Sequence, residues 1–147
     1  MAVYTGTCNF YTKSKLKALS AALDLSTGNF YVALTTSSHT PLIDTHEYAD
    51  DITNELSGSG YARVLLTSLA LAISGSNVYW DFDDAVFTAS GGSLVGYNFH
   101  VLKNNGVGDA SNELILFGLL DETPASVTTT DGNTETIQWN ALGLVKF

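Results

Sequence analysis

The chain has 147 residues, of which 45% are hydrophobic and only 14% are charged, and its 15 acidic and six basic side chains give a formal net charge of −9. This composition is that of one folded domain and excludes a disordered chain, and the negative charge opposes binding to nucleic acid because phosphate would be repelled. Cys8 is the single cysteine, which excludes an intrachain disulfide and a cysteine-based zinc cage.

The N-terminal part, residues 1–28, is expected to supply an arm and one short helix. Leu16, Leu19 and Leu23 repeat at helical spacing, which predicts a helix from Thr12 to Leu25 whose leucine face packs on a sheet. The chain start lacks the basic and apolar regions of a signal peptide, and no apolar stretch has membrane-spanning length. We therefore expect no membrane association.

Residues 29–147 have the pattern of an all-β unit, with short runs of β-branched and aromatic residues separated by Gly, Ser, Asn and Asp. Short strands at regular spacing are typical of a β-sandwich or a jelly roll. We treat residues 1–147 as a single domain. The predicted strands are Phe30–Thr35, Ala62–Leu66, Leu69–Ser74, Asn77–Phe82, Ala85–Ala89, Val95–Leu102, Glu113–Leu119, Ser126–Thr129, Glu135–Trp139 and Leu144–Phe147.

Two segments contain residue types that favour tight turns. Gly75-Ser76-Asn77 predicts a tight connection between two strands, and Asp131-Gly132-Asn133 contains the Asp-Gly pair that favours a hairpin with positive φ angles. The longest stretch without a predicted element is a loop at residues 37–60, which leads into Tyr61. A loop of that length in a compact domain is usually functional or ordered by a partner.

Charge is uneven along the chain, since three lysines lie close together near the N-terminus and acidic residues crowd the long loop. The simpler interpretation is two solvated faces. The sharper interpretation is that the basic segment meets an acidic surface on a neighbouring subunit. The residues that would make such partner contacts are Lys13, Lys15, Lys17, Asp44, His46, Glu47, Tyr48, Asp50, Asp51 and Glu55.

None of the candidate chemistry in the sequence predicts an enzyme or a cofactor site. The acidic residues around His46 match no metal-binding spacing, and Asp50 and Asp51 lack the later positions of an EF-hand. Ser59 lies between two glycines but lacks the flanking positions of a nucleophile elbow. We expect no catalytic residue, no metal and no cofactor.

Aromatic residues beside carboxylates offer a carbohydrate-binding alternative. Asp81 and Asp83 would share one face of a strand while Trp80 and Phe82 share the other, so the aromatic pair is expected in the core. Trp139 with Ile137 gives the same pattern near the C-terminus. A sugar platform would instead need Tyr79, Trp80 or Tyr97 to be exposed.

One stretch has a more specific likeness. Tyr31-Val32-Ala33-Leu34, the acidic loop and then Glu55-Leu56-Ser57-Gly58-Ser59-Gly60-Tyr61-Ala62-Arg63 follow one another in an order that resembles small virion proteins of tailed bacteriophages. The segment from Asp131 to Trp139 is similar to the last hairpin of that group. Leu56 departs from the valine usual there, and the loop between Val101 and Glu113 resembles an insertion.

The resemblance implies a structural protein of the virion, assembled in the host cytoplasm, and some such proteins resemble capsid cement or decoration proteins. It further implies the major capsid protein as partner and self-association as a homo-oligomer. Residues 1–17 and the loop from Asp44 to Tyr61 would then form the contact surface, and deleting Met1–Phe10 should abolish binding without unfolding the domain. Neck, tail or fibre adaptors that bind a host are the first alternative, and a carbohydrate-binding module is the second.

Overall fold

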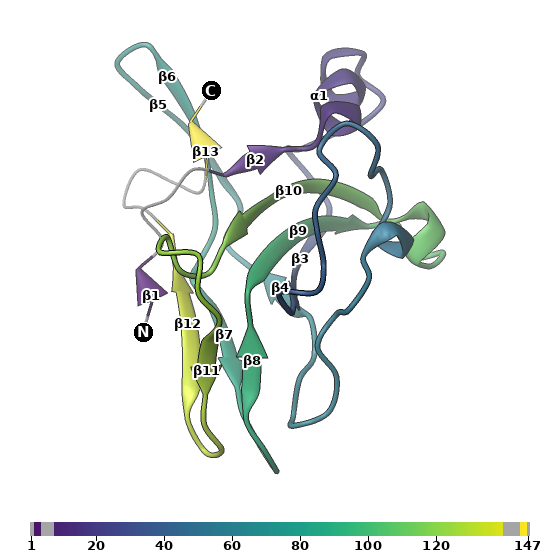
Figure 1. Ribbon diagram of the computed structural model, residues 1–147. Helices are drawn as coiled ribbons and strands as arrows, with labels where there is room; N and C mark the ends of the chain where they lie inside the picture. The colour runs from purple at the N-terminus through teal and green to yellow at the C-terminus, as the bar shows by residue number, and fades with distance from the viewer. Residues whose placement is uncertain (1, 4–7, 140–144, 147) are drawn as a thin grey trace.

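The computed structural model describes residues 2–3, 8–139 and 145–146 of the chain (Figure 1). Within them strands dominate, and α1 (Thr12–Leu19) is accompanied by two single-turn 3₁₀ helices, η1 (Ala49–Asp51) and η2 (Asp109–Ser111). The expectation of an all-β fold with one short helix is confirmed. Its assignment to a sandwich or jelly roll stays a prediction.

The central element is a five-stranded antiparallel sheet. Strands β3 and β9 form its middle and pair along their whole lengths, from Asn29 opposite Asn104 to Thr35 opposite Asn98. In spatial order the sheet consists of β2 (Asn9–Phe10), β10 (Glu113–Leu119), β9 (Asn98–Asn104), β3 (Asn29–Thr35) and β4 (Val64–Leu66).

Three smaller sheets complete the fold (Figure 1). In the first, β1 (Ala2–Val3) runs parallel to β12 (Thr134–Gln138), which also pairs with β7 (Ala85–Thr88). The second joins β11 (Val127–Thr129) to β8 (Leu94–Gly96). The third has the order β13 (Val145–Lys146), β6 (Asn77–Asp81) and β5 (Ala70–Ser74).

The main core fills the space between the central sheet and the smaller sheets. Alternate residues of β3, such as Phe30 and Val32, point into it because side chains on a strand alternate between faces. They pack there with Trp80, Phe87 and Ile137. Trp80 and Phe82 are buried, as is Trp139, which confirms the predicted core positions.

The opposite face of the central sheet is also covered. A second apolar cluster there joins Ala33, Leu102 and Leu114 of the sheet to Tyr11 and Ala49. Tyr11 precedes α1, and Ala49 belongs to the loop at residues 37–60. That loop therefore closes the second face of its own sheet, which explains why five successive residues of β9, from Asn98 to Leu102, are all buried.

The prediction that the leucine face of the helix packs on a sheet is wrong. The helix ends at Leu19, and Leu16 and Leu19 are 64% and 89% exposed. Ser14 is the buried residue instead, and its hydroxyl donates a hydrogen bond to the carbonyl of Leu114. Leu23 does reach the core, from the segment that follows the helix.

The early end of α1 has a local cause at Ala21, which adopts a left-handed conformation with φ of 58°. The N–H of Ala22 donates to the carbonyl of Lys17 at 2.9 Å, and the N–H of Ala21 donates to that of Ala18 at 3.3 Å. These two bonds are the pattern of a Schellman motif, in which a left-handed residue stops the helix. The motif turns the chain before the predicted helix is complete.

Most predicted strands agree with the structure within a few residues. The predicted strand Val95–Leu102 is divided into β8 and β9, and β1 and β2 were missed. Because Phe10 pairs with Leu116 and Tyr11 is fully buried, residues 9–11 belong to the body of the protein and not to a separate arm. Of the predicted strand Leu144–Phe147, the structure describes Val145–Lys146, which form β13. Its first and last residues lie outside the described residues.

The two predicted turns had different outcomes. Gly75 and Ser76 join β5 to β6 in a tight hairpin, as expected. The turn at Asp131 and Gly132 is present, but it connects β11 to β12, which lie in different sheets, so the predicted hairpin is wrong. The Gly132 N–H donates instead to the carbonyl of Ala89 at 2.9 Å, which ties the turn to the end of β7.

Candidate functional site

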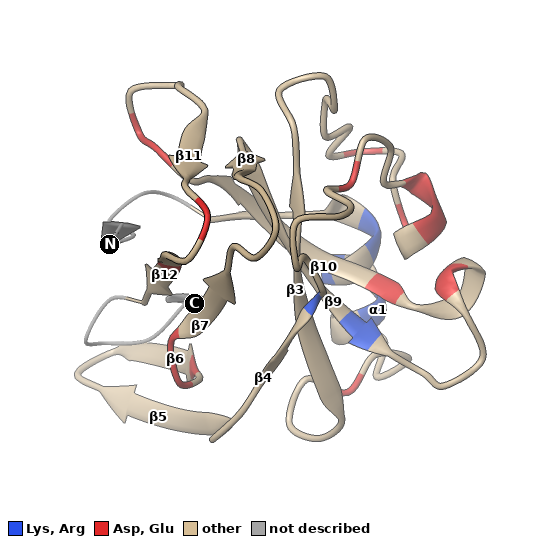
Figure 2. Ribbon diagram, turned by 90° about the horizontal axis from the view of Figure 1, so that it is seen from below, with Lys and Arg blue, Asp and Glu red and all other residues tan. Residues whose placement is uncertain are grey.

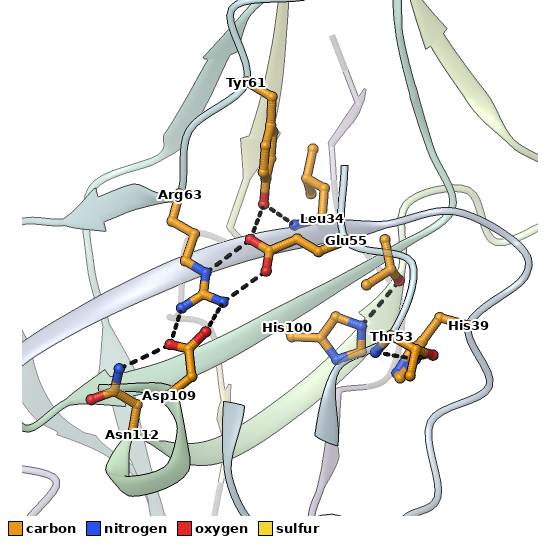
Figure 3. Close-up of polar contacts among 10 residues, drawn as sticks. Leu34, His39, Thr53, Glu55, Tyr61, Arg63, His100, Asp109 and Asn112 are labelled. Carbon is orange, nitrogen blue, oxygen red and sulfur yellow. Dashed lines mark hydrogen bonds and ion pairs between the residues drawn. The ribbon is translucent and has the colours of Figure 1, made fainter. Parts of the chain in front are cut away.

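The stretch from Glu55 to Arg63, which we call the signature stretch, supplies three residues of a polar network. This network, which we call the Arg63 clip, is made of Glu55, Tyr61, Arg63 and Asp109 (Figure 3). The Arg63 guanidinium donates to both oxygens of Glu55, from Nε at 2.8 Å and from Nη2 at 2.7 Å. It also donates to both oxygens of Asp109, at 2.7 and 2.9 Å. Two-pronged pairs of this kind fix geometry as well as adding energy. The hydrogen bonds to Glu55 and Asp109 raise the pKa of Arg63.

Tyr61 connects the clip to the central sheet. Its hydroxyl donates to Glu55 Oε1 at 2.8 Å and accepts a hydrogen bond from the Leu34 backbone N–H at 2.9 Å. Burial, reinforced by the Glu55 carboxylate, raises the pKa of Tyr61. The ring stacks on Phe87 with centroids 6.1 Å apart. The chain thus returns from the loop at a fixed point on β3.

The Gly-Ser-Gly segment before Tyr61 is a packed joint and not a flexible spacer. Gly58 and Gly60 have φ of 69° and 75°, which side chains rarely adopt. A Cβ on Gly60 would lie 2.9 Å from Ser90 Cβ, and the Ser59 carbonyl accepts a hydrogen bond from the Ser90 N–H at 2.8 Å. The glycines allow this segment to lie directly against the loop that follows β7.

Lys17 makes a second connection, between α1 and the loop at residues 37–60. Its Nζ forms an ion pair with Glu47 at 2.8 Å, approaches Glu113 at 3.5 Å and donates to the Tyr48 hydroxyl at 3.1 Å. Burial alone would lower the pKa of Lys17, but the hydrogen bond to Glu47 leads the contacts that raise it. Lys17 and Glu47 therefore meet within one chain. Figure 2 shows the blue of α1 close to red segments of this region.

Several other candidate contact residues also hold the loop in place. Asp51 accepts hydrogen bonds from the backbone N–H groups of Glu47 and Tyr48, at 2.7 and 3.1 Å. Asp44 accepts one from the Thr12 hydroxyl at 2.7 Å, and Glu55 belongs to the Arg63 clip. The remaining exposed candidates are Lys13, Lys15 and Asp50.

All three histidines of the chain lie close together, because His39 and His46 of the loop meet His100 of β9. His39 lies edge-on to His100 with centroids 4.9 Å apart, and 5.6 Å from His46. His100 is fully buried, and its ring nitrogens contact the Tyr11 hydroxyl at 3.0 Å and the Thr35 hydroxyl at 3.2 Å. Burial, followed by the two other histidines, lowers the pKa of His100 to about 3.

His39 is the less satisfied member of this cluster. Its Nδ1 accepts a hydrogen bond from the Thr53 N–H at 3.3 Å and contacts the Thr53 hydroxyl at 3.0 Å (Figure 3). The buried Nε2 has no hydrogen-bond partner in the part of the chain that the structure describes. Burial lowers the pKa of His39, and His46 lowers it further. The lowered pKa values of His39 and His100 favour the neutral forms of these two side chains.

Across residues 2–3, 8–139 and 145–146, no group of His, Cys, Asp and Glu is arranged to hold a metal ion. Within the same residues, no helix combines the length and apolarity needed to cross a membrane. Tyr79 and Trp80 are 8% and 0% exposed, so neither supplies the exposed platform that a sugar site would need, and Tyr97 is half-buried.

Exposed apolar side chains lie on two elements at one end of the molecule, which we call the apolar end. It comprises Leu16 and Leu19 on α1 together with Leu71, Ile73 and Val78 on the hairpin of β5 and β6, and these two elements project from the same side of the fold (Figure 1). The hairpin residues Leu71 and Ile73 are 55% and 79% exposed. A hollow of about 450 Å³ lies between Ala18, Ala21 and Leu23 near α1 and Leu71 of the hairpin.

Sequence reasoning missed both the clip and the apolar end. Arg63 is the only arginine in the chain, and nothing nearby in the sequence indicates its partner Asp109. The apolar end could have been noticed because no charged residue occurs between Arg63 and Asp81.

Comparison with known proteins adds nothing to the interpretation of the Arg63 clip or of the apolar end, since no family model, curated protein or solved structure matches the chain.

Proposed function

We propose that the chain is a non-enzymatic structural protein of a tailed-phage virion, most specifically a cement or decoration protein that binds the major capsid protein. The finer fold assignment, a β-sandwich or jelly roll, belongs to the same proposal. So do its location in the virion and its assembly in the host cytoplasm.

The observation that carries the proposal is the apolar end. Leu19 and Ile73 are each more than three-quarters exposed, at 89% and 79%, although neither is needed to fill the core. Gathered exposed apolar residues mark surfaces that bind other proteins. Leucine and isoleucine side chains on a projecting hairpin and helix suit the groove of a shell subunit better than they suit water.

Exposed positive charge beside the apolar end indicates which kind of partner surface would be complementary. Lys13 and Lys15 are exposed on the same helix as Leu16 and Leu19. A basic rim beside an apolar centre is the usual anatomy of a protein interface. A partner with an acidic rim around an apolar groove would therefore be complementary to this end.

The signature that resembles virion proteins has a structural use in this chain. Glu55, Tyr61 and Arg63 close the base of the loop, and Gly58 and Gly60 allow a tight joint. These are requirements of folding and not of catalysis. They support a resemblance to virion proteins that is based on a shared fold. The proposed binding surface is the apolar end, which lies outside this stretch.

Purified particles of the virus that encodes the chain provide the test. If the chain decorates the shell, quantitative mass spectrometry should find on the order of a hundred or more copies per particle, because a closed symmetric shell repeats its contacts. A neck, tail or fibre component would be present in far fewer copies. Absence of the chain from purified particles would overturn the proposal.

Binding by the apolar end is tested separately with particles that lack the chain. Adding Leu19→Asp protein should give at least tenfold weaker binding than the unaltered protein. Val107→Asp is the matched control, because Val107 is 81% exposed but lies between β9 and η2, outside the apolar end, and it should bind normally. Equal binding by both variants would exclude the apolar end as the contact surface.

A further inference from the structure

Strand β5 is an open sheet edge. It pairs with β6 on one side, and in the described structure it ends its sheet on the other. All five of its residues, from Ala70 to Ser74, are exposed. Its hairpin extends away from the body of the protein (Figure 1). The outer side of β5 is therefore accessible along its whole length.

The turn geometry determines which backbone groups face outward. Gly75 has φ of 62°, and Ser74 pairs with Asn77 across a two-residue turn. In such hairpins the residues flanking the turn form a hydrogen-bonded pair, and hydrogen-bonded and non-hydrogen-bonded pairs then alternate. Leu71 and Ile73, which lie opposite Trp80 and Val78, fall on non-hydrogen-bonded positions. Their backbone N–H and C=O groups consequently point to the open side.

This edge has none of the features that usually protect an exposed strand. Natural proteins place charged residues, proline or a bulge at open edges to prevent pairing. The sequence of β5 is Ala-Leu-Ala-Ile-Ser, and its register with β6 is regular from Ala70 to Ser74. Figure 2 shows β5 without any charged residue. An unprotected edge of this kind indicates a strand that is paired in the working form of the protein.

Charge favours a second copy of the chain as the pairing strand. Two molecules that each carry a net charge of −9 repel one another, so they can approach most easily where charge is absent. The run from Val64 to Trp80 is uncharged and includes the whole exposed hairpin. The hairpin thus offers an exposed surface through which two copies can meet without opposing like charges.

We infer that β5 pairs antiparallel with β5 of a second copy, around a two-fold axis that passes beside Ala72. In that register Leu71 lies opposite Ile73 of the other copy, and the outward backbone groups of both residues are matched. Ala72 faces its own counterpart at a non-hydrogen-bonded position, where strands approach most closely and a small side chain fits. The two three-stranded sheets become one continuous sheet. Self-association of the isolated protein does not depend on the proposed role in a virion.

Sedimentation equilibrium of the purified protein tests the association. The unaltered protein should show a concentration-dependent dimer below about 100 μM. Ile73→Pro removes an outward N–H and is compatible with an edge position, and Ile73→Lys places a charge there. Both variants should be monomeric at that concentration. Val78→Lys alters the neighbouring strand but not the open edge, so it should remain dimeric.

Crosslinking tests the register. Under mild oxidation, Ala72→Cys should form a covalent dimer, because facing residues at a non-hydrogen-bonded position have Cα atoms about 4.5 Å apart, within disulfide range. Ala70→Cys lies on the same face of the same strand but would face Ser74 of the other copy, so it should not crosslink. The unaltered protein controls for Cys8. A monomeric unaltered protein, a dimeric Ile73→Lys variant, or equal crosslinking of the two cysteine variants would each overturn the inference.

Discussion

Tyr61 and Glu55 lie six residues apart and are joined by a hydrogen bond of 2.8 Å from the phenol to the carboxylate. The same phenol accepts the Leu34 N–H, so one oxygen connects the end of the loop to the middle of the central sheet. Arg63 then fixes Glu55 from the other side. The signature stretch therefore acts by closing a loop.

Removing the hydroxyl in Tyr61→Phe should lower the free energy of unfolding by about 1–3 kcal/mol, because the partly buried Leu34 N–H loses its partner. Urea denaturation monitored by fluorescence would measure it. Tyr97→Phe, at another half-buried tyrosine, should change stability by less than about 0.5 kcal/mol. Equal effects at the two positions would show that the Tyr61 hydroxyl contributes nothing specific.

Lys17 and Lys15 provide a matched pair on one helix. Lys17→Gln should destabilise the protein by about 1 kcal/mol, since it removes a partly exposed ion pair with Glu47 and the contact with the Tyr48 ring. Lys15 is exposed, and Lys15→Gln should be neutral within about 0.5 kcal/mol. Thermal melts at low and high salt would check both, with the Lys17 effect reduced in high salt. A Lys15 effect as large as that of Lys17 would contradict this assignment.

Stability should fall as the pH drops below about 6.5. Burial lowers the pKa of His39, and it lowers that of His100 to about 3, so both are neutral in the folded protein while an unfolded chain takes up protons below its ordinary histidine pKa. Because the unfolded state then binds more protons, the contribution is complete above that pKa and is lost towards acid pH. The groups that face the cluster are His46, Tyr11 and Asp51.

The effect should be measurable above the pH range in which carboxylates ordinarily titrate. Between pH 7.5 and 5.5 the free energy of unfolding should decrease by about 1–3 kcal/mol, since a histidine that stays neutral in the folded protein contributes about 1.4 kcal/mol per pH unit below its ordinary pKa. The lowered pKa values of Glu47, Asp51 and Asp109 affect only the range below about 4.5. Urea denaturation across this range is the measurement. His100→Gln should be less stable but should show a shallower pH dependence, and an unchanged slope would contradict the assignment.

Ala21 offers a stabilising substitution. Its left-handed φ of 58° costs an alanine about 1–2 kcal/mol, which glycine avoids. After allowing for the greater freedom of glycine in the unfolded chain, Ala21→Gly should stabilise the protein by about 0.5–1 kcal/mol and raise the melting temperature by a few degrees. Ala22→Gly, at a neighbouring position without positive φ, should be neutral or destabilising. Calorimetry of the two variants would distinguish a local conformational effect from a general one.

The strands could be predicted because their signals are local. Glu113–Leu119 was predicted without error, and Asn77–Phe82 and Ala85–Ala89 were each one residue too long, since alternation and turn residues bound them on both sides. The Gly75-Ser76 hairpin was equally clear. The end of the helix was not, because an alanine, and not a glycine, occupies the left-handed position at residue 21.

The arrangement of the site depends on distant pairings that no local pattern contains. Arg63 meets Asp109 across 46 positions, and Tyr11 meets His100 across 89. The acidic loop was expected to meet a neighbour, and that contact stays a prediction. Within the chain, Glu47 pairs with Lys17 of α1, Asp51 accepts a hydrogen bond from the loop backbone and Glu55 pairs with Arg63. Charge clustering alone could not indicate whether the partners of those residues lie in this chain or in another.

The pairing of Ala2 with Ile137 has a consequence for biosynthesis. A parallel pair between the first and twelfth strands cannot form until nearly the whole chain has left the ribosome, and contacts between such distant residues make folding slow. The uncharged β5 hairpin needs only its own neighbouring residues, so it can form while the rest of the polypeptide is still being made. Nascent chains on one polysome would then display this hairpin to each other before their sheets are complete, and cells should recover more soluble protein when Ile73 is replaced by lysine.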